Sequence, residues 1–257
     1  MKIRQIVYFA TCCLIFAQES NAQSLSLGLV AQFNLDGNAF DSSGNGINGI
    51  VPNDATWTTD RFGNPDGALD FGTSGEAVLG TGINLANSSS SISLWIEKNY
   101  VGDGSNGGWF LRVGDNGAAG QAMHLATDYG QSIRYSFYYD DFDINSPTLL
   151  ANNWYNLTFT FDNTTDERAI YVNGSLVATD TAAYGFSGDS SFGFGFQNIS
   201  LDDISFYNRV LTPIEISQIY NEPNPVPEPS SFALVTIGVL IMVQAYGKTK
   251  IQIAKND

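Results

Sequence analysis

The sequence predicts an all-β protein, a two-sheet antiparallel sandwich with one short C-terminal helix. Three observations predict this fold class. Only 14% of the 257 residues are charged, 13% are aromatic and 26 are glycine, which is typical of β-rich globular proteins rather than helical bundles or disordered chains. Apolar and polar residues alternate at several places along the chain. An Asn-Gly pair also separates two apolar runs, as in a β-hairpin.

Residues 1–22 predict a secretory signal peptide. Lys2 and Arg4 supply its positive start, an apolar stretch follows, and small residues stand before the cleavage site expected at Gln23. An N-terminal membrane anchor is the alternative, but this apolar stretch is short for a span of ~20 residues. Cys12 and Cys13 both lie in this segment, so the mature protein needs no disulfide.

Residues 23–221 are expected to form one domain of half-buried antiparallel strands. In residues 91–97, for example, Ile92, Leu94 and Ile96 alternate with polar residues and tryptophan. The same period predicts strands at residues 133–139, 156–161 and 191–196. Asn173-Gly174, between residues 169–172 and 176–178, predicts a hairpin, because both residues tolerate the positive φ angles of a type I′ turn.

One helix is predicted after these strands. Thr212-Pro213-Ile214-Glu215 has an N-cap residue, a proline at the first helical position and a glutamate three residues after the cap. Apolar residues follow at helical spacing, and the helix is expected to end before Pro223.

The C-terminal segment predicts a membrane span on the end of a linker. Residues 222–230 are proline-rich and cannot hold a helix or a central strand. Residues 231–247 are hydrophobic, and residues 248–257 form a basic tail, which the positive-inside rule places in the cytoplasm. The alternative is a buried core strand or helix, because apolar runs of 10–14 residues are often that.

The order of these three parts resembles the PEP-CTERM sorting signal of exported proteins in Gram-negative bacteria. The motif itself is Val226-Pro227-Glu228-Pro229. The resemblance implies secretion across the inner membrane, recognition by an exosortase, and at least transient single-pass anchoring at the cell envelope or extracellular surface. The tail departs from the family in having dispersed lysines instead of an arginine cluster.

Several motifs of the body resemble a laminin-G-like, concanavalin A-type jelly-roll domain. They occur in the expected order at residues 29–49, 61–64, 68–71, 92–97, 153–160, 170–174 and 201–212. The resemblance implies a jelly-roll sandwich over roughly residues 29–221. It specifies the fold more than the ligand, because one fold hosts many functions.

Charge and histidine content exclude several function classes. The chain has 11 Lys and Arg against 26 Asp and Glu, a formal net charge of −15. Residues 23–229 hold 6 of the basic and 24 of the acidic residues, a net charge of −18. Nucleic acid and anionic membrane surfaces are therefore not expected partners. The one histidine, His124, excludes a multi-histidine zinc site and is expected to be a packed or surface residue.

The resemblance to laminin-G-like domains implies calcium as a cofactor. Asp36, Asp41, Asn45 and Asp202 carry hard oxygen ligands suited to calcium, and the terminal strands that hold them lie side by side in related domains. Asp203 is expected on the other side of its strand. The alternative is that the loop around Asp41 and Asn45 forms Asx turns that satisfy its own backbone.

Two aromatic regions are candidates for sugar contact. Tyr135, Phe137, Tyr138 and Tyr139 precede a group of three acids, Asp140, Asp141 and Asp143. The preferred interpretation places the alternate aromatics in the core and the acids in a solvated loop. Trp109 follows a glycine-rich stretch and is expected either to be an exposed loop residue or to anchor the next strand.

The sequence therefore predicts a non-catalytic, envelope-anchored protein that binds exopolysaccharide or other glycans. The alternative is a structural or adhesive matrix protein that contacts other proteins. A glycoside hydrolase or polysaccharide lyase is a third candidate. The hydrolases of this fold carry a Glu-x-Asp-x-x-Glu strand, which the chain lacks, and Glu76, Glu97 and Glu167 stand apart.

Overall fold

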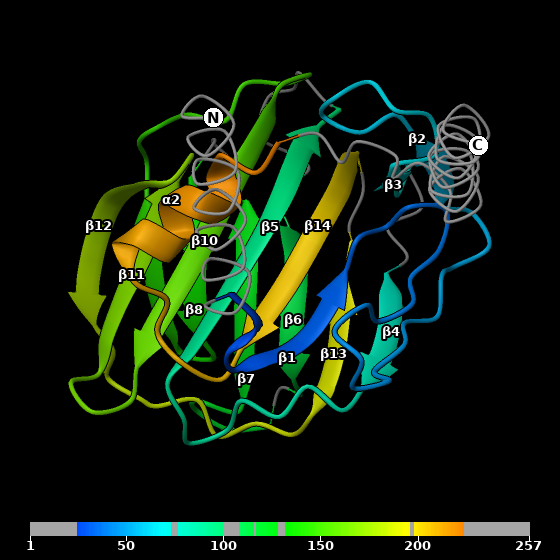
Figure 1. Cartoon of the computed structure of the whole chain (residues 1–257). Coiled ribbons are helices and arrows are strands. Elements are labelled where there is room, and N and C mark those ends of the chain that lie inside the picture. Colours follow the sequence, from blue (N-terminus) through cyan, green and yellow to red (C-terminus); the bar gives the residue numbers. More distant parts are fainter. Residues whose placement is uncertain are drawn as a thin grey trace, which may run out of the picture. The chain divides into compact units, whose positions relative to one another are not determined.

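The chain divides into two compact units, and the first unit ends at Glu222. Two antiparallel sheets packed face to face form this first unit (Figure 1). The computed structural model describes residues 25–72, 77–99, 108–115, 117–127, 132–195 and 198–223. The expected signal peptide, PEP motif, hydrophobic segment and basic tail lie outside these residues. Among the described residues, no helix has the length and apolar character needed to cross a membrane.

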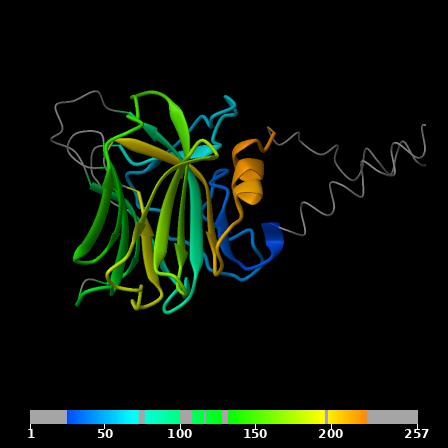
Figure 2. The same cartoon turned by 90° about the vertical axis from the view of Figure 1, so that its left-hand side faces the viewer.

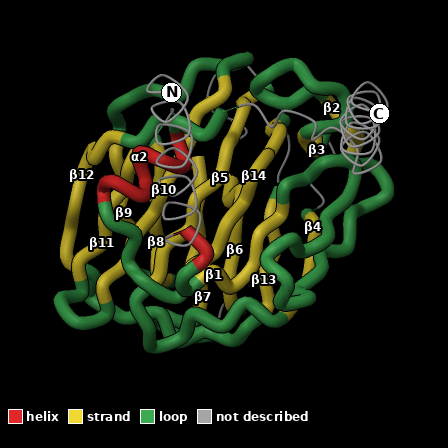
Figure 3. The backbone as a smooth tube through the Cα atoms, in the orientation of Figure 1, coloured by secondary structure: helices red, strands yellow, loops and turns green. Residues whose placement is uncertain are grey.

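The large sheet has eight strands. In spatial order they are β12 (Ser175–Thr181), β11 (Glu167–Val172), β10 (Trp154–Asp162), β5 (Ser90–Lys98), β14 (Ile199–Tyr207), β3 (Ala68–Asp70) and β2 (Thr56–Thr58), with β1 (Leu29–Phe33) also paired to β14. The small sheet has six strands. Their order is β4 (Val78–Thr81), β13 (Ser191–Phe194), β6 (Gly108–Gly114), β7 (Ala122–Thr127), β8 (Ile133–Phe137) and β9 (Asp140–Ile144). Figure 3 shows these strands in yellow, joined by loops in green.

Side chains from the facing sides of both sheets form the core. Phe137 of the small sheet meets Phe161 of the large sheet with ring centroids 4.9 Å apart, and Tyr135 meets Phe159 at 5.4 Å. All four rings are buried. Burial of each such side chain contributes about 1.5–3 kcal/mol, so these aromatic contacts are a main source of the sandwich's stability.

A buried arginine also bridges the two sheets. Arg168 of β11 is fully buried and pairs with Asp180 of β12 at 2.6 Å and with Asp140 of β9 at 3.2 Å. Its Nη1 also donates a hydrogen bond of 2.8 Å to the backbone carbonyl of Asp140. Asp140 is therefore part of this structural bridge rather than of a solvated loop.

Most strand predictions are confirmed, and the exceptions lie at strand ends. The segment expected at 133–139 is a strand only to Phe137, because Tyr138 and Tyr139 form the turn into β9 and Tyr139 has a φ of 68°. The Asn173-Gly174 hairpin is confirmed, with φ angles of 50° and 74°. Tyr135 and Phe137 are buried in the core, which confirms the prediction that the alternate aromatic residues of this segment are core residues.

Helix α2 (Pro213–Tyr220) covers part of the outer side of the large sheet. Its N-cap and capping box at Thr212 and Glu215 are confirmed. Figure 2 shows the helix, in orange, on the side of the sandwich away from the small sheet. Polar side chains lie buried on this side of the large sheet, where Asn156 donates to Ser93 at 3.3 Å and Thr158 to Ser93 at 2.9 Å.

Candidate functional site

Charged side chains gather at a split in the edge of β14. Leu201 pairs with β3, whereas residues 204–207 pair with β1, so the neighbour of β14 changes at Asp202 and Asp203. A β-bulge lies at this point, and Asp203 has a left-handed φ of 45°. Bulges redirect side chains. Asp203 thus reaches the same partner as Asp202, and the expectation that it faces the other side is wrong.

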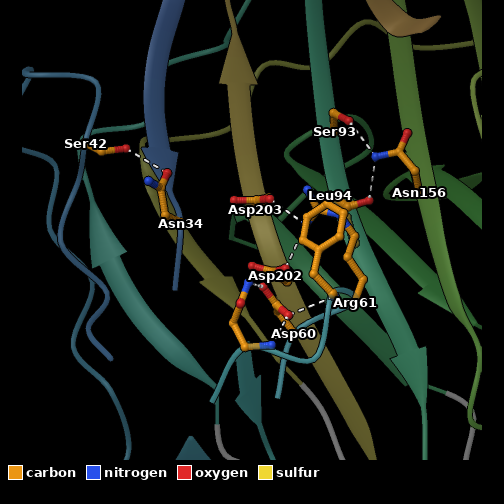
Figure 4. Close-up of polar contacts among 11 residues, drawn as sticks. Asn34, Ser42, Asp60, Arg61, Ser93, Leu94, Asn156, Asp202 and Asp203 are labelled. Carbon is orange, nitrogen blue, oxygen red and sulfur yellow. Dashed lines mark hydrogen bonds and ion pairs between the residues drawn. The ribbon is translucent and has the colours of Figure 1, made fainter. Parts of the chain in front are cut away.

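That shared partner is Arg61. Its Nη1 donates to Asp202 Oδ2 at 2.8 Å and to Asp203 Oδ2 at 2.6 Å (Figure 4). The side chains of Arg61 and Asp202 are only 6% and 3% exposed. The guanidinium carbon also lies 4.3 Å from the Phe62 ring centroid and 4.4 Å from that of Trp95. Ion pairing and cation–π contact together hold Arg61 in place.

Several acids share the positive charge of this arginine. Burial, followed by the charge of Asp203, raises the pKa of Asp202 above its usual value. Burial, followed by the charges of Asp203 and Asp60, also raises the pKa of Asp36. One guanidinium thus only partly offsets the charge of an acidic group, which we call the Arg61 cluster: Asp36, Asp60, Arg61, Asp202 and Asp203.

The loop after β1 uses Asp41 and Asn45 for its own backbone. The Asp41 carboxylate accepts from the backbone N–H groups of Gln32, Ser43 and Ile47 at 2.9–3.0 Å. Partial burial raises the pKa of Asp41, but a hydrogen bond from the Ser43 side chain, together with these backbone hydrogen bonds, outweighs it and leaves the pKa below its usual value. The Asn45 amide nitrogen donates to the Val30 carbonyl at 3.0 Å. These are the backbone-satisfying contacts of the Asx alternative.

The four residues predicted to bind calcium therefore fall into two groups. Asp36 and Asp202 belong to the Arg61 cluster, whereas Asp41 and Asn45 are engaged in their own loop. Figure 4 shows Ser42 of that loop apart from Asp202 and Asp203. Within the described ranges, no three His, Cys, Asp or Glu side chains are grouped to hold a metal ion. This arrangement does not fit a single calcium cage, and calcium at these residues stays a prediction.

A second polar surface covers the outer side of the small sheet. Strand register places Gly193, Arg112, His124, Ser136 and Asp141 in one row across β13, β6, β7, β8 and β9. A neighbouring row consists of Trp109, Ala126, Arg134 and Asp143. Val113, Met123 and Phe137, which alternate with the first row, are in the core, so both rows point outward. We call these two rows the small-sheet face.

Trp109 lies on a floor of small residues. Its register partner on β7 is Ala126. A methyl group built on Gly193 would lie 3.6 Å from the indole ring, so the ring lies beside the bare backbone of β13. Trp109 is half-buried, and the Arg112 guanidinium carbon lies 5.6 Å from its ring centroid. The sequence allowed Trp109 to be either an exposed loop residue or an anchor of the next strand. The structure places it in a strand, with its ring on the outer face.

The charged residues of the small-sheet face are bound to one another. Arg134 donates to both oxygens of Asp143, at 2.7 and 2.8 Å, and lies 3.3 Å from Asp141. Asp141 also accepts from Ser136 at 2.5 Å. Arg112 pairs with Asp115 at 2.8 Å. The face thus offers a ring beside a row of guanidinium, carboxylate and hydroxyl groups in fixed positions.

His124 lies in the middle of this face. It is half-buried, and burial followed by the charge of Arg112 lowers its pKa below 6.5. Its ring meets that of Tyr138 edge-on with centroids 6.4 Å apart. The prediction of a packed or surface histidine is therefore confirmed.

Sequence reasoning missed the partners that organise both surfaces. Arg61 was noted only as part of a motif, and Arg112, Arg134 and Ser136 were not singled out. Alternation in residues 133–139 does indicate that Arg134 and Ser136 share a face, but it does not reveal which acids they meet.

Comparisons with known proteins agree with this architecture. A laminin G family model, described as the concanavalin A-like lectin/glucanases superfamily, matches residues 71–217. A search of curated proteins gave no match. Among solved structures, the binding domain of botulinum neurotoxin serotype D is similar at a TM-score of 0.61 and 18% identity, over 75% of this chain and 51% of that chain.

Two further solved structures show the same degree of similarity. The receptor-binding domain of botulinum neurotoxin type G gives a TM-score of 0.60 at 17% identity, over 75% of this chain and 51% of that chain. The binding domain of Paraclostridial Mosquitocidal Protein 1 gives 0.58 at 18%, over 76% and 52%. This chain spans about half the length of these structures, and identities this low support the fold alone.

Proposed function

We propose that this chain, which belongs to the concanavalin A-like lectin/glucanases superfamily, binds exopolysaccharide or other glycans without breaking bonds in them. The position of Trp109 carries this proposal. A flat apolar ring on a glycine and alanine floor, next to fixed donors and acceptors, suits a sugar, whose apolar face stacks on the ring while its hydroxyls take polar partners.

The fold comparisons support a binding role of this general kind. The two neurotoxin structures are a binding domain and a receptor-binding domain, and they share this sandwich. A glycan array and a polysaccharide gel-shift assay, each with calcium and with chelator, test the proposal. We expect binding to at least one glycan class in both assays, and blank results in both would refute it.

A structural or adhesive matrix protein is the second candidate function. Large apolar side chains also stand exposed, including Phe40 at 66% and Ile50 at 75%. Such residues favour protein contacts when they form a contiguous patch. Analytical ultracentrifugation across a concentration series separates the candidates, because a matrix protein is expected to self-associate without added glycan.

An enzymatic role has less support in the described residues. Retaining glycosidases need two carboxylates ~5 Å apart that flank the substrate. On the small-sheet face, Asp141 and Asp143 instead share Arg134 as a common partner. A hydrolase or lyase would release reducing ends or unsaturated products from polysaccharides, and we expect neither on prolonged incubation.

We also propose that the protein is exported and held at the envelope. Support comes from the signal-peptide pattern of residues 1–22 and from the Val226-Pro227-Glu228-Pro229 motif before a hydrophobic segment. Cell fractionation with terminal sequencing of the mature protein tests this. We expect an N-terminus at Gln23, recovery in the envelope fraction, and a changed distribution when an exosortase is deleted.

A further inference from the structure

We propose that the small-sheet face selects uncharged glycans and rejects anionic ones. This inference rests on the proposed function, and it names the chemical class of the ligand. It is carried by the way the charged groups of the face are paired, which is independent of the position of Trp109.

The guanidinium groups of the face are already neutralised by neighbouring carboxylates. Arg134 binds Asp143 through two parallel hydrogen bonds, and Arg112 binds Asp115. Bidentate arginine–carboxylate pairs are among the strongest hydrogen-bonded contacts in proteins. A uronate, sulfate or phosphate group would therefore meet guanidinium groups whose positive charge these carboxylates already offset.

The balance of charge also opposes an anionic ligand. Two guanidinium groups, of Arg112 and Arg134, face three carboxylates, of Asp115, Asp141 and Asp143. His124 adds no charge at neutral pH, because burial and Arg112 lower its pKa. Beyond the face, the net charge of −18 for residues 23–229 repels anionic polymers within about a Debye length, ~8 Å at physiological salt.

Hydroxyl groups, in contrast, can join these pairs without breaking them. An ionised carboxylate offers about four acceptor positions, so one that is bound to arginine keeps room for a sugar hydroxyl. The side chains of Asp141 and Asp143 are 48% and 37% exposed. The exposed sides of these carboxylates are therefore acceptors, and a sugar hydroxyl is a donor that brings no charge.

A second aromatic group marks the opposite end of the face. Tyr139 is 74% exposed, and its ring centroid lies 4.4 Å from that of Tyr138. The backbone N–H of Tyr138 donates to the carbonyl of Ala122, which lies four residues along β7 from Ala126, the partner of Trp109. At 3.3 Å per residue this separates the two aromatic ends by ~13 Å along the strands. An extended uncharged chain lying along the strands would contact both ends and the polar row between them.

The test uses the full-length chain against two sets of polymers by affinity electrophoresis and titration calorimetry. The uncharged set is β-glucan, mannan and dextran, and the anionic set is polygalacturonate, alginate and dextran sulfate. We expect binding within the uncharged set and none within the anionic set at low and high salt. Salt-sensitive binding of the anionic set alone would overturn the inference but leave glycan binding intact. Blank results with both sets would overturn both proposals.

A double variant tests whether the pairing causes the selectivity. Asp141→Asn with Asp143→Asn keeps the size of both side chains and an acceptor for Ser136, but it removes the two carboxylates of this face that pair with Arg134. We expect this variant to gain at least tenfold tighter binding to polygalacturonate, and the gain should shrink as salt rises. Asp54→Asn with Asp66→Asn, in loops before β2 and β3, removes the same charge elsewhere and is the matched control. An equal gain in the control would overturn the role of the pairing.

Discussion

Arg61 and Arg134 each hold a pair of aspartates, and the two pairs lie in different surroundings. Arg61 and Asp202 have side chains that are 6% and 3% exposed, and two aromatic rings flank the guanidinium. Arg134 and Asp143 are only nine residues apart in the sequence and pair across the neighbouring strands β8 and β9. Their side chains are 30% and 37% exposed. The residue types are the same, but Arg61 and Asp202 are shielded from water, whereas Asp203 is 29% exposed and the Arg134 pair is more accessible still.

This difference separates a structural role from a binding role. Removing one partner of a buried ion pair leaves an uncompensated charge, which is costly, whereas exposed pairs contribute little to stability. The Arg61 cluster therefore fixes the junction of β1, β3 and β14. Arg134, Asp141 and Asp143 are paired with one another and remain accessible to a ligand.

The largest expected effect is the loss of Arg61. Arg61→Ala leaves Asp202 and Asp203 close together without their cation, so we expect the free energy of unfolding to fall by about 3–5 kcal/mol. Arg134→Ala is the matched control and should cost no more than about 1 kcal/mol. Urea unfolding followed by circular dichroism measures both. Equal losses for the two variants would break the comparison.

Calcium provides the next test of the buried group. With Arg61 serving as the cation beside Asp202, we expect neither calcium nor chelator to shift the melting temperature of the wild-type chain. Asp41→Ala should lower the free energy of unfolding by about 1–3 kcal/mol in either condition, because it leaves backbone N–H groups without an acceptor. A calcium-dependent rise in the melting temperature that Asp41→Ala abolishes would instead support the calcium site predicted from the sequence.

The floor of the small-sheet face gives a prediction about binding. A methyl group at Gly193 would be tight against Leu79 at 3.1 Å and in ordinary contact with the Trp109 ring at 3.6 Å, so the two further methyl groups of Gly193→Val are expected to crowd the indole. We expect glycan affinity to fall about tenfold, equivalent to ~1.4 kcal/mol. Gly185→Val is the control, because it adds the same bulk outside the two rows of the face, where an added methyl group would lie 3.6 Å from Asn163 and 4.0 Å from Phe161. This variant should change affinity little.

The smallest expected effect concerns His124 and pH. Its pKa in the folded protein lies below the unfolded value of 6.5, so the unfolded chain binds the proton more readily as the pH falls. This contribution to stability is complete above about pH 6.5 and is lost as the pH falls below it. The unfolding free energy of His124→Gln should therefore decline less between pH 7.5 and pH 5 than that of the wild type. Parallel declines would contradict the burial of His124.

The fold was largely predictable from local patterns, whereas the candidate site was not. Alternation in residues 91–97, the Asn173-Gly174 turn and the capping box at Thr212 all depend on neighbours in sequence, and each is confirmed. The partnership of Arg61 with Asp202 joins residues 141 positions apart at a bulge that no local pattern specifies. The alternating pattern also predicted a strand that extends beyond Phe137, because alternation of apolar and polar residues does not mark where the chain turns.

Titration of the full-length chain and its Trp109→Ala variant with the uncharged polysaccharides tests the central claim most directly. Buried aromatic anchors typically contribute about 2 kcal/mol or more to binding, so the variant should bind at least tenfold more weakly while Phe40→Ala, an exposed aromatic in the loop after β1, binds like the wild type. Circular dichroism should show both variants folded. Undiminished affinity in folded Trp109→Ala would contradict a ligand surface on the small sheet.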